Sequence, residues 1–175
     1  MPAIILVMDA AWLPPLAVLI ATNSAPVVAA WLWRGRPARP IDGGRTWRDG
    51  RPLLGSHKTW RGLAAAVLAG AAMAPWLGLA VWRGALAGLL AIAGDAASSF
   101  VKRRLGRPSG ASVHGLDQLP EALLPLLVLW RPLGLDVATA VVAVVAFAVL
   151  DALTVRGLTA LRHRRPPSPD AGRRS

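Results

Sequence analysis

The sequence contains no cysteine and few acidic residues. Without cysteine the chain has no disulfide, no thiol nucleophile and no zinc site built from thiolates. Nine Asp and Glu stand against twenty Lys and Arg, which gives a formal net charge of +11. In a soluble protein this charge would suggest nucleic-acid binding, but here the basic residues form blocks between long apolar runs. We therefore expect a membrane protein and no nucleic-acid partner.

Apolar residues make up 54% of the chain, more than an ordinary soluble domain of this size carries. Several apolar stretches approach the roughly 20 residues that a helix needs to cross the hydrocarbon core of a membrane. We predict an all-α, polytopic membrane protein with about five transmembrane helices. The five stretches run from Ile4 to Trp33, Leu63 to Trp82, Gly84 to Val101, Leu119 to Trp130 and Val137 to Val155.

The first apolar stretch has no Lys or Arg in its first 33 residues, so it does not resemble a cleaved signal peptide and is predicted to be a retained span. Pro14, Pro15 and Pro26 predict that this helix is kinked or broken, because each proline removes a backbone donor. A break beside Asn23 would lie close to a polar side chain. Asn23 is therefore a candidate functional residue.

The distribution of charge predicts the orientation, because loops rich in Lys and Arg stay in the cytoplasm. Eight basic residues lie between Arg34 and Arg61, four between Lys102 and Arg107, and six from Arg156 onward. Five spans place all of these on one side, with the N-terminus outside and the C-terminus inside. We expect residues 1–165 to form one domain in the cell membrane, with cytoplasmic loops at 34–62 and 102–117, and residues 166–175 to form a disordered cytoplasmic tail.

The first cytoplasmic loop is richer in glycine and charge than a connector requires. It holds six glycines, eight basic residues and two acids. Glycines let backbone amides approach an anion closely, and cations neutralise phosphates. The alternative is a solvated loop whose arginines only set the topology. The spacing excludes a Walker-type P-loop, which would also need a preceding strand. The candidate residues in this loop are Asp42, Gly43, Gly44, Gly55, Lys58, Thr59 and Arg61.

A second candidate segment surrounds Asp95, which falls inside or at the inner end of the third apolar stretch. A carboxylate in that setting is costly unless it is paired or bound to metal, so it marks a functional site by default. Ser99 and Lys102 follow at a spacing that places them near the same helix face. The alternative is a polar patch in which Asp95 bridges to Lys102 or Arg103.

A third segment begins at Asp117, and Glu121 follows four residues later on the same face of a helix that starts there. Together with Asp95 these residues supply carboxylate oxygens, the hard ligands that Mg²⁺ prefers. Asp117 is alternatively the N-cap of the fourth helix, with Pro120 in its first turn, and the two roles can coexist.

Four other ionisable residues have simpler explanations. His57 and His114 have no partner at a metal-ligand spacing, and both are predicted to be loop residues. Asp9 and Asp151 also lie in apolar runs. Snorkelling or a local ion pair explains them, and Arg156 is close enough in sequence to pair with Asp151.

These segments resemble the CDP-archaeol synthase family, which is related to the phosphatidate cytidylyltransferases. The likeness covers NSAP from Asn23, PIDGGRTWRDGRPLLGSHKTWRG, GDAASSFVKRRLG and LDQLPEALL. In the wider family an S-x-x-K-R element precedes a D-R-x-D element. The first matches Ser99, Lys102 and Arg103, and the second matches Asp117 and Gln118. Pro120 stands where that element has its second Asp, and the neighbouring Glu121 is a candidate to take its role.

The resemblance implies transfer of CMP from CTP to the phosphate of a membrane lipid, with release of pyrophosphate and with Mg²⁺ as cofactor. The lipid is either phosphatidate or an archaeal ether-lipid phosphate. Asp95 and Asp117, with Glu121, would hold the metal. The implied catalytic residues are Lys58, Asp95, Lys102 and Asp117, and the implied substrate-binding residues are Asn23, Asp42, Gly43, Gly44, Gly55, Thr59, Arg61, Ser99 and Arg103.

Two other hypotheses remain. A non-catalytic membrane protein or small transporter would have polar residues at mid-span in several helices and symmetry between its halves, and the sequence displays neither pattern. An enzyme of the same fold that acts on another lipid phosphate is the second alternative, and the proline at position 120 keeps it open.

Overall fold

The computed structural model describes residues 10–34, 36–109 and 117–163, with side chains described as far as residue 154. These residues form helices and loops, and their only β-structure consists of two isolated bridges within one loop. The predicted all-α fold is therefore confirmed. Asp9, His114 and the predicted tail at 166–175 lie outside the described residues. The elements are α2 (Leu13–Leu32), α3 (Trp60–Met73), the 3-10 helix η1 (Ala74–Leu77), α4 (Val81–Arg104), α5 (Gln118–Leu129) and α6 (Val137–His163).

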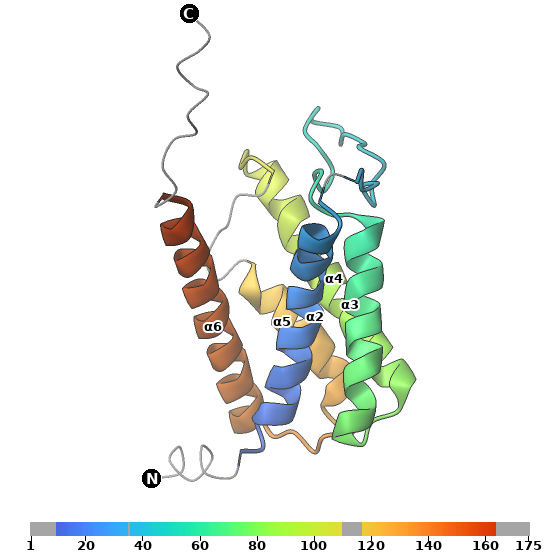
Figure 1. Cartoon of the computed structure of the whole chain (residues 1–175), viewed down its shortest axis with the longest axis vertical. Helices are drawn as coiled ribbons and strands as arrows, with labels where there is room; N and C mark the ends of the chain where they lie inside the picture. The colour runs from blue at the N-terminus through green and yellow to red at the C-terminus, as the bar shows by residue number, and fades with distance from the viewer. Residues whose placement is uncertain (1–9, 35, 110–116, 164–175) are drawn as a thin grey trace, which may run out of the picture.

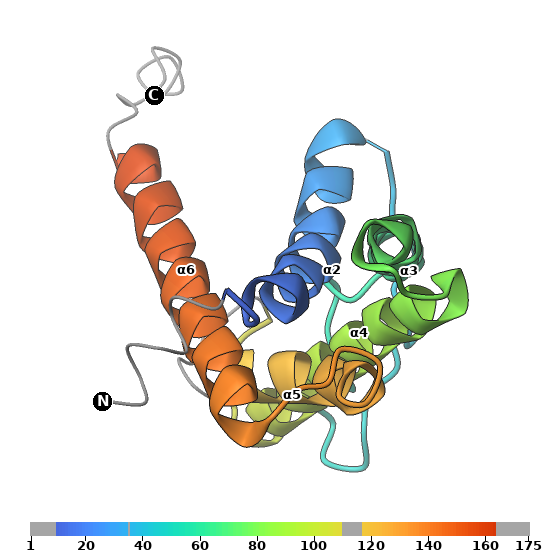
Figure 2. The same ribbon diagram turned by 90° about the horizontal axis from the view of Figure 1, so that it is seen from below.

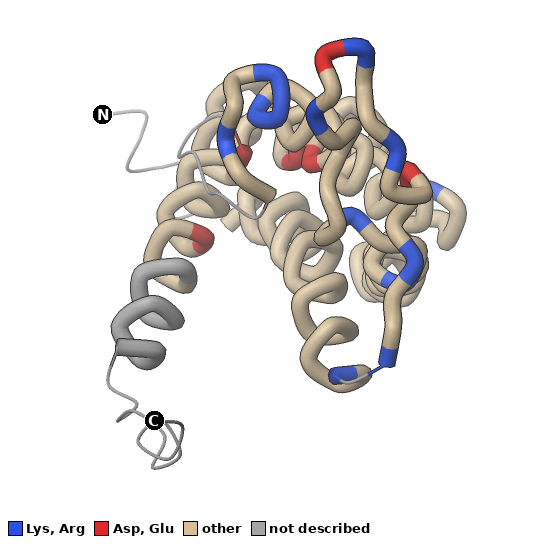
Figure 3. Tube along the Cα trace, turned by 90° about the horizontal axis from the view of Figure 1, so that it is seen from above, with Lys and Arg blue, Asp and Glu red and all other residues tan. Residues whose placement is uncertain are grey.

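Three helical segments are long and apolar enough to cross a membrane: Leu13–Leu32, Val81–Arg104 and Val137–Thr154. The other two helices are shorter, with 14 residues in α3 and 12 in α5. Successive helices alternate in direction, so the α2–α3 loop lies at the same end as the C-terminal ends of α4 and α6 (Figure 1). Lys and Arg gather over this end (Figure 3). The arrangement agrees with the predicted charge asymmetry, while the number of crossings and the orientation stay predictions.

Of the predicted kink or break in the first helix, the break is wrong, because α2 is continuous from Leu13 to Leu32 with Pro26 inside it, and the kink stays a prediction. Pro14 and Pro15 fall in the first turn, where helical amides have no intrahelical acceptor and a missing donor costs little. Asn23 Nδ2 donates to the carbonyl of the residue four positions earlier at 2.9 Å, and the hydroxyls of Thr22 and Ser24 do the same. These bonds satisfy the polar groups within the helix.

The turn between α3 and α4 comes earlier than the sequence predicted. Pro75 lies in η1, and Gly78, with φ 66°, ends it. Helix α4 then begins at Val81. Trp82 and Arg83 therefore belong to the first turn of α4 rather than to the end of the preceding span, because the proline and the left-handed glycine stop the helix before the charge does.

Helices α3 and α4 touch through their backbones. A Cβ on Gly84 would stand 2.0 Å from the carbonyl oxygen of Gly70, and one on Gly88 would stand 2.3 Å from that of Ala66. Small residues permit this close approach between helices in membranes. Helix α6, in contrast, packs mainly on α2 and α5 and stands at the edge of the bundle (Figure 2).

Candidate active site

The loop between α2 and α3 has a defined hairpin-like fold. Isolated bridges pair Pro40 with Thr59 and Thr46 with Pro52. The amide of Trp47 donates to the carbonyl of Arg51 at 2.8 Å, which closes the tip. Positive φ angles at several glycines, among them 62° at Gly43 and 75° at Gly44, provide the turns. The glycines that the sequence analysis assigned to nucleotide binding therefore shape the loop.

Asp42 organises the base of this loop. Its Oδ1 accepts from the amide of Gly44 at 2.9 Å, and its Oδ2 accepts from the amides of Leu54 at 2.9 Å and Gly55 at 3.3 Å. Burial alone raises the pKa of Asp42, but these amide hydrogen bonds together outweigh burial and hold the pKa below its usual value. The contacts of Asp42 thus hold the loop together, and its predicted role in substrate binding stays a prediction.

The tip of the loop docks on the C-terminal end of α4. Arg51 Nη1 donates to the carbonyl of Arg104 at 2.5 Å, and Arg104 Nη1 pairs with Asp49 Oδ1 at 2.8 Å. The ring of Trp47 meets Phe100 edge to face, with 5.5 Å between centroids. Sequence reasoning missed this docking. The sequence feature that could have indicated this docking is Asp49, the single acid at the tip of a basic loop.

The base of the loop carries Lys58 to the side of α4, where its Nζ forms an ion pair with Asp95 Oδ2. The next residue, Thr59, is the N-cap of α3, and its Oγ1 accepts from the amide of Gly62 at 3.2 Å. The structure thus gives Asp95 a partner from the loop. The alternative in which Asp95 bridges to Lys102 or Arg103 is not what the structure has.

About two turns further along α4, Lys102 reaches the start of α5. Its Nζ lies 2.7 Å from Asp117 Oδ1, and the side chains are only 8% and 15% exposed. Asp117 occupies the N-cap position of α5, but its side chain makes no capping hydrogen bond. Its carboxylate serves the ion pair instead, so the N-cap alternative accounts for its position but not for its contacts.

Arg103 is the most deeply buried charged residue of the described chain, at 3% exposure. Its Nε and Nη2 have no hydrogen-bond partner among the described residues. Gly55 of the loop lies beside it, since a Cβ on that glycine would stand 3.5 Å from Arg103 Nη1 and 2.5 Å from Ser109 Oγ. A buried guanidinium with unsatisfied donors is costly, and a phosphate oxygen is the ligand that best satisfies it.

Helices α4 and α5 meet at Gly94. A Cβ there would stand 2.3 Å from the carbonyl oxygen of Pro120 and 2.7 Å from the amide of Glu121. This contact brings the segment after Asp117 against the segment that carries Asp95. The carboxylates of Asp95 and Asp117 both act electrostatically on Glu121. Pro120 therefore lies at a helix contact, and the charge nearest to it in sequence is supplied by Glu121.

The acids fit a metal ion that arrives with a substrate better than one held by protein alone. The described residues contain no group of three or more His, Asp and Glu that is arranged to hold a metal. Asp95 and Asp117 each face a lysine. Mg²⁺ commonly takes one or two carboxylates and completes its shell with water and substrate phosphates. The Mg²⁺ site at Asp95, Asp117 and Glu121 stays a prediction.

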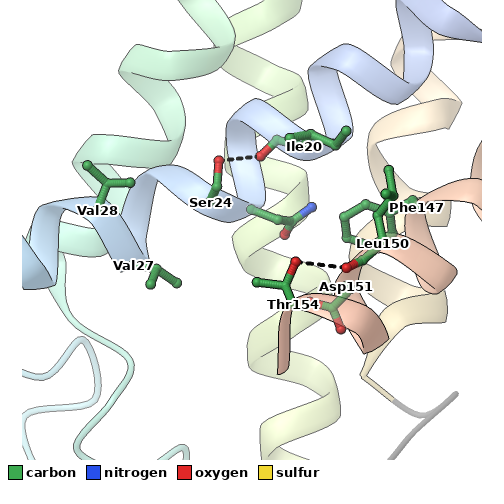
Figure 4. A pocket seen from close by; sticks show the side chains of 9 residues that line it. Ile20, Ser24, Val27, Val28, Phe147, Leu150, Asp151 and Thr154 are labelled. Atoms are coloured by element: carbon green, nitrogen blue, oxygen red, sulfur yellow. Dashed lines mark hydrogen bonds between the residues drawn. The ribbon is translucent and has the colours of Figure 1, made fainter. Parts of the chain in front are cut away.

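A groove opens between α2 and α6 (Figure 4). Its volume is about 340 Å³ and its surface is mostly apolar. Asn23 and Asp151 are its amide and its acid. Asp151 Oδ2 accepts a hydrogen bond from Gln118 Nε2 at 2.9 Å, a partner that the sequence analysis did not foresee. The groove is lined by Ile20, Asn23, Ser24, Val27, Val28, Phe147, Leu150, Asp151 and Thr154.

The structure thus brings together part of the predicted site. Lys58 with Asp95 and Lys102 with Asp117 form two ion pairs on one side of the α4–α5 contact. Ser99 is buried on α4, and Asn23 lies in the groove. Arg61 is directed elsewhere, because its Nη1 donates to the carbonyl of Trp33 at 3.3 Å. Gly43 and Gly44 are exposed on the loop.

Comparison with known proteins adds an independent line of evidence. A family model described as CDP-archaeol synthase matches residues 4–82 and 75–158. A CDP-archaeol synthase of Hyperthermus butylicus is 36% identical over 156 residues, which cover 86% of this chain and 89% of the relative. One of Halorubrum lacusprofundi is 36% identical over 151 residues, covering 74% and 83%. A solved structure of an intramembrane enzyme for archaeal membrane lipid biosynthesis matches with a TM-score of 0.65 and 35% identity, over 86% of this chain and 94% of that one.

Proposed function

The chain belongs to the CDP-archaeol synthase family and is a membrane-integral lipid-phosphate cytidylyltransferase, and from this premise we propose that it transfers CMP from CTP to an archaeal ether-lipid phosphate. The products are CDP-archaeol and pyrophosphate. The names of the relatives favour the ether lipid, and nothing favours phosphatidate as the substrate. The cell membrane is the proposed location, with the basic loop on the cytoplasmic side, where CTP is available.

The observation that carries the proposal is the convergence of cations at the α4–α5 contact. Lys102 and Arg103 are almost fully buried there, and Lys58 reaches the same region from the loop. Both lysines are balanced by carboxylates, whereas Arg103 keeps two donors without a hydrogen-bond partner among the described residues. This arrangement suits a ligand that brings several negative charges, which is the character of a nucleoside triphosphate.

The reaction needs no strong general base, because the lipid phosphate is already an anionic nucleophile. Its oxygen attacks the α-phosphorus of CTP and forms a new phosphorus–oxygen bond. The bond from the α-phosphorus to the bridging oxygen breaks, and pyrophosphate leaves with the electron pair. The protein therefore has to align two anions and to neutralise the charge that develops on the leaving group.

Lys58, Lys102 and Arg103 are the groups that meet this need. When phosphates approach, the two lysines exchange an aspartate partner for phosphate oxygens, and Arg103 gains the acceptors that it lacks. Asp95 and Asp117 would then be available to hold Mg²⁺, which would supply positive charge to neutralise the phosphates. The groove between α2 and α6 accommodates the lipid chains, because its surface is mostly apolar and it lies between two long apolar helices.

The test is CTP-dependent release of pyrophosphate by the purified protein in detergent with Mg²⁺. An archaeal ether-lipid phosphate, phosphatidate and a lipid-free sample are compared, with Asp95→Asn as the inactive variant. Asp136→Asn is the matched control, because Asp136 caps α6 at the opposite end of the bundle through the amide of Thr139 at 2.6 Å. Release that requires the ether lipid and is lost only in Asp95→Asn supports the proposal. Folded protein that releases no pyrophosphate with either lipid would contradict it.

A further inference from the structure

Asp151 connects the groove to the acid site. It lies on α6, lines the groove and accepts a hydrogen bond from Gln118 at 2.9 Å. Gln118 is only 4% exposed and directly follows Asp117, whose carboxylate pairs with Lys102 at 2.7 Å. One side chain of α6 is thus linked to the start of α5.

This contact is unusual for α6. Among the described residues it is the one side-chain hydrogen bond that joins α6 to another helix, whereas Ala140, Val144 and Phe147 of α6 belong to the apolar core. A carboxylate on a mostly apolar groove wall is costly, and a single neutral amide does not neutralise it. An apolar residue would pack equally well against the groove. The cost of placing Asp151 there therefore indicates that this residue has a role beyond packing.

We propose, on the basis of the function above, that Asp151 is a positioning residue for the lipid phosphate and acts through Gln118. The hydrogen bond fixes the amide of Gln118 and holds the start of α5 against α6 at the inner end of the groove. The lipid then meets Lys102 and Arg103 with its phosphate in register for attack.

The distinguishing prediction is a separation of the two substrates. Asp151→Leu removes the acceptor but fits a mostly apolar wall, and it should raise the KM for the ether-lipid phosphate roughly tenfold or more, as expected when a hydrogen bond to a charged group is lost. The KM for CTP should change less than about twofold, because CTP does not enter the groove. Asp151→Asn keeps an oxygen acceptor for Gln118 and should stay within about threefold of the wild type.

A reciprocal exchange tests whether the hydrogen bond itself matters. Gln118→Glu alone places two carboxylates face to face and should raise the lipid KM at least as much as Asp151→Leu. The double variant Gln118→Glu with Asp151→Asn restores a donor opposite an acceptor, so its KM for the lipid should return most of the way to the wild-type value. Val149→Ala is the control on α6, because Val149 is exposed and lies outside the groove lining.

Binding without turnover completes the experiment. The full chain is heated in detergent with and without a short-chain ether-lipid phosphate, in the absence of CTP. The lipid should raise the Tm of the wild type and of Asp151→Asn, but not that of Asp151→Leu. Equal stabilisation of all variants, or a parallel rise of both KM values in Asp151→Leu, would overturn the proposal. A wild type that binds the lipid but releases no pyrophosphate would instead contradict the proposed reaction and leave the role of Asp151 in lipid binding supported.

Discussion

Helices α3, α4 and α5 are joined through their backbones, whereas the loop above them and α6 beside them are joined through side chains. The first region, the glycine-packed core, is defined by the contacts of Gly84 with Gly70, Gly88 with Ala66, and Gly94 with Pro120. The second region, the side-chain-held periphery, comprises the α2–α3 loop and α6. Its attachments are the pairs of Asp49 with Arg104 and of Gln118 with Asp151.

The difference matches the two substrates. Backbone contacts leave no room for adjustment, so they suit the place where the proposed reaction would need Asp95 and Asp117 at a fixed separation. Side-chain contacts are individually weak and can be remade, so they suit the elements that a nucleotide and a two-chain lipid must pass. Four substitutions test whether the two regions differ in this way.

The largest effect is expected from Gly94→Val. The added side chain would collide with the carbonyl of Pro120, which is backbone and cannot turn away, so α5 must shift from α4. Because that shift separates Asp95 from Asp117, pyrophosphate release should fall by more than about a hundredfold. Ala93→Val is the matched control, since Ala93 is exposed on the same helix. Similar activity in the two variants would show that the α4–α5 contact does not set the site.

Arg103→Met should separate stability from activity. The guanidinium is buried in the core with two donors that lack hydrogen-bond partners among the described residues, so replacing it with an apolar chain of similar length should stabilise the protein by about 1–2 kcal/mol. The same change should lower kcat/KM for CTP by about a hundredfold, because a charge-assisted contact with phosphate is lost. Thermal unfolding and pyrophosphate release measure the two effects. A lower Tm would mean that Arg103 already contributes to stability without a ligand.

A smaller effect is expected from loosening the loop. Asp49→Asn removes the ion pair with Arg104, which is partly exposed and so contributes less than about 1 kcal/mol. Trypsin should cut the loop a few times faster, while activity at saturating CTP stays within about twofold. Combining Asp49→Asn with Arg104→Lys should accelerate cutting further, because Arg104 Nη2 also donates to the carbonyl of Pro52 at 2.6 Å, but by less than the sum of the two single changes, because both remove the same ion pair. Fully additive effects would show that the two residues act separately.

The sequence was sufficient to predict the membrane class, the helical fold and the grouping of basic segments at one end. Apolar length and charge blocks report these properties directly. The same approach failed at Pro26, because a helix that satisfies its polar groups internally can pass through a proline. It also failed at the α3–α4 turn, where a left-handed glycine ended the helix before the charged residue did.

The candidate site was predicted in its residue types but not in its pairings. Asp95 stood out as an acid in an apolar run, yet its partner Lys58 is 37 residues away in sequence and no local spacing points to it. Asp151 was explained by the nearby Arg156, whose side chain lies outside the described part of the chain. The pairing with Gln118 depends on how α5 and α6 pack, and that packing is set by tertiary contacts rather than by local sequence.

The smallest expected effect concerns pH and the base of the loop. The folded state holds the pKa of Asp42 below its usual value through amide hydrogen bonds, so its contribution to stability is fully present above about pH 4 and is lost as the pH falls through the lowered pKa. Tryptic or peptic cutting of the wild-type loop should therefore accelerate only in that acidic range. Asp42→Asn should be cut faster at neutral pH as well, and its cutting rate should show no change at acidic pH, because the residue no longer titrates.

Since Asp42 holds the segment that leads to Lys58, the Asp42→Asn variant should also bind CTP a few times more weakly. If cutting accelerates while CTP binding is unchanged, the position of Lys58 is set by its ion pair with Asp95 and not by the loop. Lys58 would then belong to the glycine-packed core rather than to the side-chain-held periphery.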